Sequence, residues 1–233
     1  MTGRRTSSGP RSFWRNNSLT IVFGLLLLVF VVGQAVAGLA EYNESARTDG
    51  LQQLSFPRYV TSSSFAVDLL ENWQSEYLQF TLYILLTVWL VQRGSSESKK
   101  VGEEGRESDE AQLVGAHARS DSPPWARRGG WRGSLYSHSL VGVMALVFLL
   151  SWFAQAVTGR VAENDLRLRD RLDPVSLGDY LVSPDFWSRT VQNWQSEMLA
   201  IGSMAVFAIY LRERGSPESK PVGVPHGATT SDD

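Results

Sequence analysis

The sequence predicts an all-α membrane protein with four transmembrane helices, and two observations lead to this class. The first is a set of long apolar segments in a chain whose other segments are polar. The second is a tandem duplication, because the sequence Asn-Trp-Gln-Ser-Glu occurs at residues 72–76 and again, 121 residues later, at residues 193–197. Together they predict two copies of a two-helix unit, each with an outer amphipathic helix.

The duplication extends well beyond this motif. A shift of 121 residues places residues 16–102 on residues 137–223 without a gap and gives 31 identities in 87 pairs. Two helices of merely similar composition would not keep a gapless register across the loops around them. We therefore predict a first repeat at residues 18–92 and a second at residues 137–212.

The composition excludes several classes of function. The net charge is −2 and the Lys and Arg residues are scattered, which predicts no nucleic-acid partner. Cys is absent and His occurs only three times, so we predict no metal ligands and no cofactor. The chain has no P-loop, dinucleotide fingerprint, zinc-protease motif or nucleophile elbow. No residue is therefore assigned as catalytic.

The first predicted span is residues 18–40, which are 23 residues without a charge. This length suffices for a hydrocarbon core of about 30 Å, and the basic residues 1–17 precede it. A cleaved signal peptide is the competing interpretation, because residues 35–37 (Ala-Val-Ala) fit a small-residue cleavage site. The run is longer than a usual signal core, and its repeat partner, residues 139–159, lies in the middle of the chain. Both facts favour a span, and residues 139–159 are the third.

The second and fourth predicted spans are residues 73–92 and 194–211. Each has a short apolar core that reaches spanning length only when the motif Trp is included. Trp73 and Trp194 are therefore predicted to be interface anchors, since Trp is enriched at the level of the headgroups. Ahead of each Trp, apolar side chains recur at helical spacing, which predicts the outer amphipathic helices.

The remaining segments are polar. Residues 93–136 and residues 213–233 are predicted to be a disordered linker and a disordered tail. The two chain ends and the linker carry fifteen Lys and Arg residues, whereas the two loops between paired spans carry seven. The positive-inside rule therefore predicts a multi-pass protein of the cell (inner) membrane with both termini and the linker in the cytoplasm. The lipid bilayer is the predicted partner, and a homo-oligomer or a protein partner stays open.

Eight polar residues form the candidate site. Polar groups inside a membrane are costly, so they indicate either function or helix packing. In each motif copy Asn, Ser and Glu have i, i+3, i+4 spacing and share one helix face. A Gln near the outer end of the preceding span is expected at a similar depth and within reach of a motif Glu. The set is Gln34, Asn72, Ser75, Glu76, Gln155, Asn193, Ser196 and Glu197.

Three functions are compatible with this cluster. In the first, which the sequence favours, the polar groups hold the helices together in a non-enzymatic envelope or interaction module. In the second, they form the polar site of a small channel or carrier between the repeats. In the third, Glu76 and Glu197 serve a membrane-embedded enzyme as acid and base, although nothing else in the chain resembles a catalytic assembly.

Four segments together resemble bacterial membrane proteins that are catalogued only as a domain of unknown function. They are residues 33–38, Tyr59 with Ser62 and Phe65, the motif at 72–76, and the Arg-Gly-Ser-x-Glu-Ser-Lys segment at 93–99. The resemblance covers both halves of the chain and implies a small bacterial multi-span membrane protein. It carries no activity, ligand or catalytic residue. The second copy departs from the pattern with Ala154 and Thr158 in place of small residues of the first.

Overall fold

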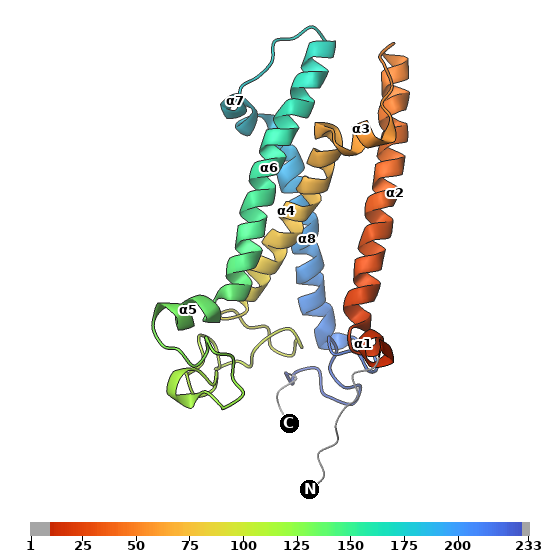
Figure 1. Ribbon diagram of the computed structural model, residues 1–233. Coiled ribbons are helices and arrows are strands. Elements are labelled where there is room, and N and C mark those ends of the chain that lie inside the picture. Colours follow the sequence, from red (N-terminus) through yellow and green to blue (C-terminus); the bar gives the residue numbers. More distant parts are fainter. Residues whose placement is uncertain (1–9, 230–233) are drawn as a thin grey trace. The chain divides into compact units, whose positions relative to one another are not determined.

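The computed structural model describes residues 10–229, and every regular element in that part of the chain is a helix (Figure 1). The prediction of an all-helical protein is therefore confirmed. The chain divides into two compact units, one ending at Ala66 and one starting at Val67. Residues 1–9 of the predicted N-terminal segment and residues 230–233 of the predicted tail lie outside the described residues.

The first unit is built around one long helix. It contains α1 (Pro10–Asn16), α2 (Ser18–Thr48), α3 (Phe56–Val60) and the first turn of α4 (Ser63–Leu86). With 31 residues α2 is about 46 Å long. It is long and apolar enough to cross a membrane, and little of its apolar part is buried. It also continues beyond residue 40, the predicted end of the span, because nothing before Gly50 breaks it.

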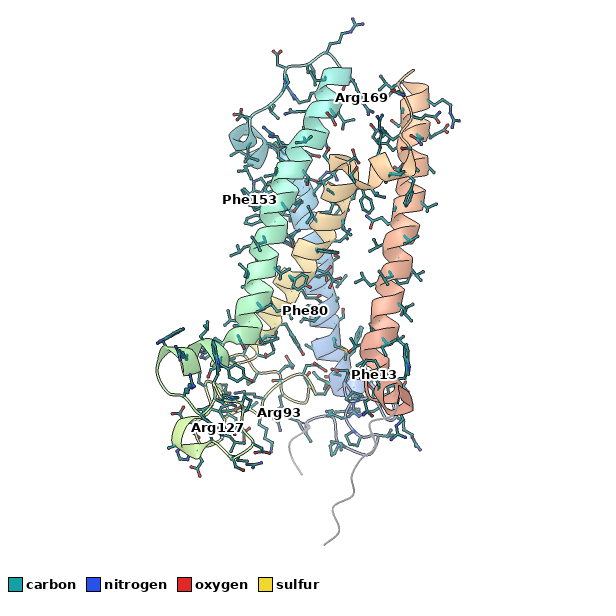
Figure 2. All side chains as sticks on the ribbon, viewed as in Figure 1. Phe13, Phe80, Arg93, Arg127, Phe153 and Arg169 are labelled. Carbon is teal, nitrogen blue, oxygen red and sulfur yellow. The ribbon has the colours of Figure 1, made fainter. Side chains whose placement is uncertain are left out.

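The second unit contains two long helices that run antiparallel and are joined by a short one. Its elements are the rest of α4, a 3-10 turn at Gly115–His117, α5 (Trp131–Ser137), α6 (Ser139–Arg169), α7 (Leu177–Leu181) and α8 (Pro184–Tyr210). Like α2, α6 has 31 residues and is apolar enough to cross a membrane. Arg169 lies at one end of α6, whereas Arg93 and Arg127 lie in loops at the opposite end of this unit (Figure 2).

Aromatic side chains hold α6 against α8. The Trp152 ring of α6 lies 6.1 Å from the rings of both Phe186 and Trp187 and 5.7 Å from that of Trp194, measured between centroids. Phe148, one turn earlier on α6, contacts Trp194 at 6.3 Å. Contacts that lie earlier along α6 lie later along α8, so the two helices run antiparallel.

In each unit a tyrosine packs against the long helix that precedes it. The buried Tyr59 ring lies against Gly38 of α2, and the buried Tyr180 ring lies against Gly159 of α6. A Cβ atom at either glycine would lie much closer to the tyrosine hydroxyl oxygen than van der Waals contact allows. The two contacts are 121 residues apart, which is the same offset as that of the duplicated motif.

An asparagine fixes the chain after each long helix. Asn43 accepts the N–H of Leu54 at 2.7 Å and donates to the C=O of the same residue at 3.0 Å. Asn164 makes the same two bonds with Val175, at 2.8 Å and 3.1 Å. Each amide side chain thus satisfies both backbone groups of one loop residue, which positions the short helix that follows.

The sequence predicts each amphipathic helix and the span that follows it as two consecutive parts. In the structure each such pair forms one continuous helix. α4 runs from Ser63 to Leu86, and α8 runs from Pro184 to Tyr210. The Ser183 hydroxyl caps α8 by accepting the N–H of Phe186, and proline occupies the first helical position. α4 ends six residues before position 92, the predicted end of its span, and the chain continues there in turns.

The Arg-Gly-Ser-x-Glu-Ser-Lys segments form the same turn after α4 and after α8. Ser98 accepts the N–H of Gln92 at 2.7 Å, and Ser219 accepts the N–H of Glu213 at 2.9 Å. The lysine that ends the second segment, Lys220, is buried and donates to the carbonyls of Pro225, His226 and Ala228. Disorder of the linker and the tail as a whole stays a prediction, because these bonds concern only the residues next to the helices.

Candidate functional site

The two copies of the motif meet along one face of α4 and one face of α8. We call this contact the α4–α8 seam and define it by Glu71, Gln74, Ser75 and Gln79 on α4 with Arg189, Trp194 and Glu197 on α8. Contacts that lie further along α4 also lie further along α8, so the two helices run parallel.

The centre of the seam is a hydrogen bond between the two motif copies. The Trp194 indole N–H donates to the side-chain oxygen of Gln74 at 2.7 Å. The Gln74 amide nitrogen donates to the C=O of Glu71 at 3.0 Å, and the Gln74 side chain is fully buried. Both ends of this amide are therefore paired, which removes most of the cost of burying it.

Glu197 lies at the C-terminal end of the seam. Its carboxylate accepts the hydroxyl of buried Ser75 at 3.4 Å, and its backbone C=O accepts the amide of Gln79 at 3.4 Å. The Ser75 hydroxyl also lies 2.9 Å from the C=O of Asn72, so its single proton is shared between two acceptors. The exposed Glu76 lies close enough for its carboxylate to repel that of Glu197.

At the N-terminal end of the seam an arginine lies among three acids. The Arg189 guanidinium lies 3.2 Å from Glu71, 3.4 Å from Asp185 and 3.7 Å from Asp68. Burial raises the pKa of the Glu71 carboxyl, and the nearby Arg189 charge offsets part of this rise. The repeat partner of Glu71 is Gln192. The second copy therefore lacks an acid at the position that binds Arg189 in the first.

The two glutamines of the predicted cluster lie elsewhere. Gln34 is half-buried on α2 in the first unit. Gln155 is buried on α6, and its side-chain oxygen has no hydrogen-bond partner among the described residues. The expected bond from Gln155 to Glu197 does not form in this part of the chain. Trp152 lies opposite residues 186–194, and the antiparallel helices carry Gln155 outward from that level and Glu197 inward.

Three further residues of the cluster bond to their own helices. Asn72 donates to the C=O of Asp68 at 2.8 Å, Asn193 to that of Arg189 at 2.9 Å, and Ser196 to that of Asn193 at 2.8 Å. These bonds do not connect one helix with another. The seam is thus asymmetric: it buries Gln74 and Ser75 of the first motif copy but leaves the corresponding Gln195 and Ser196 exposed.

Sequence reasoning missed four residues of the seam. It selected the face of Asn, Ser and Glu in each motif and overlooked Glu71, Gln74, Gln79 and Arg189. A signal was present, because Glu71, Ser75 and Gln79 are spaced four apart and therefore share a helix face. In the described residues no group of three or more His, Cys, Asp or Glu side chains could hold a metal ion. The seam can accept and donate protons and hydrogen bonds.

An open pocket of about 870 Å³ lies at the C-terminal end of α4. Its lining combines Thr87, just past the last residue of α4, with acidic and basic side chains of the following loop, among them Glu97, Lys99 and Glu107. The Tyr83 hydroxyl of α4 donates to the Glu97 carboxylate. Lys99 forms a 3.1 Å ion pair with Glu107, and this lysine lowers the pKa of the Glu107 carboxyl.

The comparisons with known proteins identify a family but no characterised relative. The model of a family described as a domain of unknown function (DUF6766) matches residues 10–231, which is nearly the whole chain. The chain matches no curated protein and no solved structure.

Proposed function

Since the chain belongs to the DUF6766 family of unknown function, we propose a role from its own residues: a four-span protein of the cell (inner) membrane whose α4–α8 seam joins the two copies of the motif. Two helices long and apolar enough to span a membrane, α2 and α6, support this proposal. The role is that of a non-enzymatic envelope or interaction module. The single observation that carries it is the hydrogen bond from Trp194 to Gln74, which links the two motif copies.

The packing of α8 on α6 supports the third and fourth spans together. If α6 crosses the bilayer, α8 lies in the same layer, because Trp152 holds the two helices side by side. The inner half of α8 exposes large apolar side chains such as Leu199 and Phe207. Phe153 of α6 likewise points away from its helix (Figure 2). Such surfaces are costly in water and favourable in lipid.

The parallel course of α4 and α8 supports α4 as a span. A helix of 24 residues is about 36 Å long, which exceeds the hydrocarbon core. Its motif lowers its mean hydropathy, but the motif is the part that pairs with α8. Trp73 is exposed beside the seam and would lie at the headgroup level as an interface anchor.

Labelling of single cysteines tests the topology, because the native chain has no Cys. Ser45→Cys at the outer end of α2 and Ser108→Cys in the linker both place the thiol at an exposed position. In intact bacterial cells, a membrane-impermeant maleimide is expected to label position 45 and not position 108, and inside-out vesicles should show the reverse. Labelling of position 45 only from the cytoplasmic side would refute the orientation. Recovery of the protein in the soluble fraction would refute the membrane assignment.

A small channel or carrier is the second candidate function. The observation that favours it is the Glu197 carboxylate, which lies in the seam with a serine hydroxyl as its partner and a second carboxylate, Glu76, nearby. Ionisable groups within a membrane typically lie on ion or proton pathways.

A further inference from the structure

Polar side chains recur at every fourth position along α4. They are Glu71, Ser75, Gln79, Tyr83 and, one residue past the helix end, Thr87. Residues four apart on a helix are neighbours, and each step of four turns by about 40° around the axis. The five side chains therefore form one continuous stripe, about 24 Å long, that winds by about 160° around the helix. We call it the α4 stripe. Its length covers most of the hydrocarbon thickness of a bilayer.

Attachment of α4 to α8 accounts for only the outer part of the α4 stripe. Glu71 and Ser75 meet the side chains of Arg189 and Glu197. Further inward, Gln79 reaches only a backbone carbonyl of α8. Tyr83 bonds to Glu97, which belongs to the loop after α4. Two polar groups thus lie deep in the proposed span without a side-chain partner on the neighbouring helix in the described residues.

The second motif copy shows that a spanning helix in this chain does not need such a stripe. The positions of α8 that correspond to Gln79, Tyr83 and Thr87 are apolar, namely Ala200, Met204 and Ala208. The stripe is therefore a specific property of α4. The two repeats do not share the stripe, so it is not a requirement of the repeated unit.

Both ends of the α4 stripe reach groups that exchange protons with water. The outer end is the cluster of Asp68, Glu71 and Asp185 around Arg189, whose summed charge is negative and attracts protons. At the inner end, Thr87 and Glu97 line the open pocket of about 870 Å³. Between the ends, the only carboxylate of α8 that contacts the stripe among the described residues is that of Glu197.

We propose that the α4 stripe is a proton path between the outer acidic cluster and the inner pocket. This inference rests on the proposed membrane topology and adds an activity to it. The Ser75 hydroxyl gives its proton to the Glu197 carboxylate as its oxygen receives a proton from the outer water, so the serine ends the step neutral. The Glu197 carboxyl then releases it through water held by the Gln79 amide to the hydroxyl oxygen of Tyr83.

The last transfer takes place at Tyr83. Its hydroxyl proton moves to the Glu97 carboxylate as its oxygen receives the incoming proton, so the tyrosine ends the step neutral. Glu97 releases its proton to water in the pocket. Only O–H bonds form and break, and no electron changes hands. One helical turn, a rise of about 6 Å, separates Gln79 from Tyr83, and water molecules can bridge this distance.

Proton flux into liposomes tests the path. The purified full chain is reconstituted into liposomes that contain a pH-sensitive dye, and an imposed pH gradient is allowed to decay under a potassium–valinomycin clamp. The wild-type protein is expected to speed the decay relative to protein-free liposomes. Tyr83→Phe and Glu197→Gln each remove a group that carries the proton, so each should slow the protein-dependent rate by roughly tenfold or more.

Two matched variants serve as controls. Tyr210→Phe removes a phenol at the inner end of α8, and Glu213→Gln removes a carboxylate of the loop after α8; neither residue belongs to the α4 stripe. Both should keep the wild-type rate. Glu97→Gln is a second test variant outside the predicted span, for use if Tyr83→Phe or Glu197→Gln fails to insert.

The outcomes separate the path from the topology. Labelling of Ser45→Cys in the same liposomes reports insertion. If the protein inserts but the wild type conducts no protons, the path is refuted and the topology stands. Wild-type rates in the inserted Tyr83→Phe and Glu97→Gln variants would also refute it, and so would a flux that follows a sodium gradient in place of the pH gradient. If the chain does not insert, the proposed topology itself fails, and the path fails with it.

Discussion

The indole nitrogen of Trp194 donates a 2.7 Å hydrogen bond to the side-chain oxygen of Gln74. The two residues occupy neighbouring positions in the same five-residue motif, but in different copies of it. The duplicated motif therefore binds to itself, and it does so between parallel helices. A tandem duplication gives the second copy the same orientation as the first, which allows the two motif helices to pair in parallel.

Gln74→Ala should destabilise the protein by about 1–3 kcal/mol, because it leaves the Trp194 N–H without its partner and opens a cavity in the seam. The matched control is Gln195→Ala, the same change at the corresponding exposed position, which should stay within about 0.5 kcal/mol of the wild type. Thermal unfolding in detergent measures both. Equal losses in the two variants would contradict the asymmetry of the seam.

Gly159→Ala should destabilise the protein by about 1–3 kcal/mol, because its Cβ would overlap the hydroxyl of Tyr180. Tyr180→Phe removes that hydroxyl, so the double variant should recover part of the loss. Gly142→Ala, on the same helix with open space around it, should be neutral or stabilising by up to about 1 kcal/mol. A double-mutant cycle of melting temperatures checks the coupling, and strictly additive effects would argue against this contact.

Glu71 should make stability depend on pH. Its pKa is raised in the folded state, so the folded chain holds this proton more tightly than the unfolded chain. The contribution is therefore fully present below the ordinary Glu pKa of 4.5 and is lost as pH rises through the raised value. Glu71→Gln should flatten the melting temperature against pH in that window. Glu41→Gln, an exposed carboxyl on α2, should leave the profile unchanged.

Gln155→Leu should leave stability unchanged or increase it. The Gln155 oxygen is buried and has no hydrogen-bond partner in the part of the chain that the structure describes, so the native amide carries a desolvation cost that leucine does not. Gln74→Leu is the informative comparison, since it breaks a paired amide of the same type and should be destabilising. A large loss in Gln155→Leu would show that Gln155 is bonded after all and would restore the predicted role of this residue in helix association.

The sequence predicted the helical class and the two strongly apolar helices, and it placed Ser75 and Glu197 in one candidate cluster, whose role stays a prediction. The length and composition of the apolar segments suffice to predict the helical class and the two apolar helices. The 121-residue offset between the two motif copies points to the candidate cluster. The partners were not predictable in this way. Periodicity shows which side chains share a face, but the neighbouring helix decides which face is buried. This is why Gln74 pairs with Trp194, whereas Asn72 only bonds to its own helix.

The depth of Gln155 illustrates a second limit. The prediction ended the third span at residue 159, which placed Gln155 near its outer end. In the structure α6 continues to Arg169, because the polar residues beyond 159 still favour a helix and the chain turns only at Arg171. The helix ends, and with them the levels of the polar groups, depend on loop contacts such as the bond between Asn164 and Val175. Hydropathy does not report these contacts.

Cross-linking in native membranes tests the central claim, the parallel pairing of the two motif copies. The Ser75 hydroxyl and the Glu197 carboxylate lie 3.4 Å apart. The glutamate side chain reaches two atoms further than that of cysteine, so Ser75→Cys combined with Glu197→Cys should be joined within one chain by a short bifunctional thiol reagent and does not need to form a direct disulfide. Ser75→Cys with Ser188→Cys is the control, because Ser188 lies about 13 Å further out along α8. The predicted result is a cross-link in the first pair and none in the control. Cross-linking of the control pair, or none in the first pair, would contradict the account.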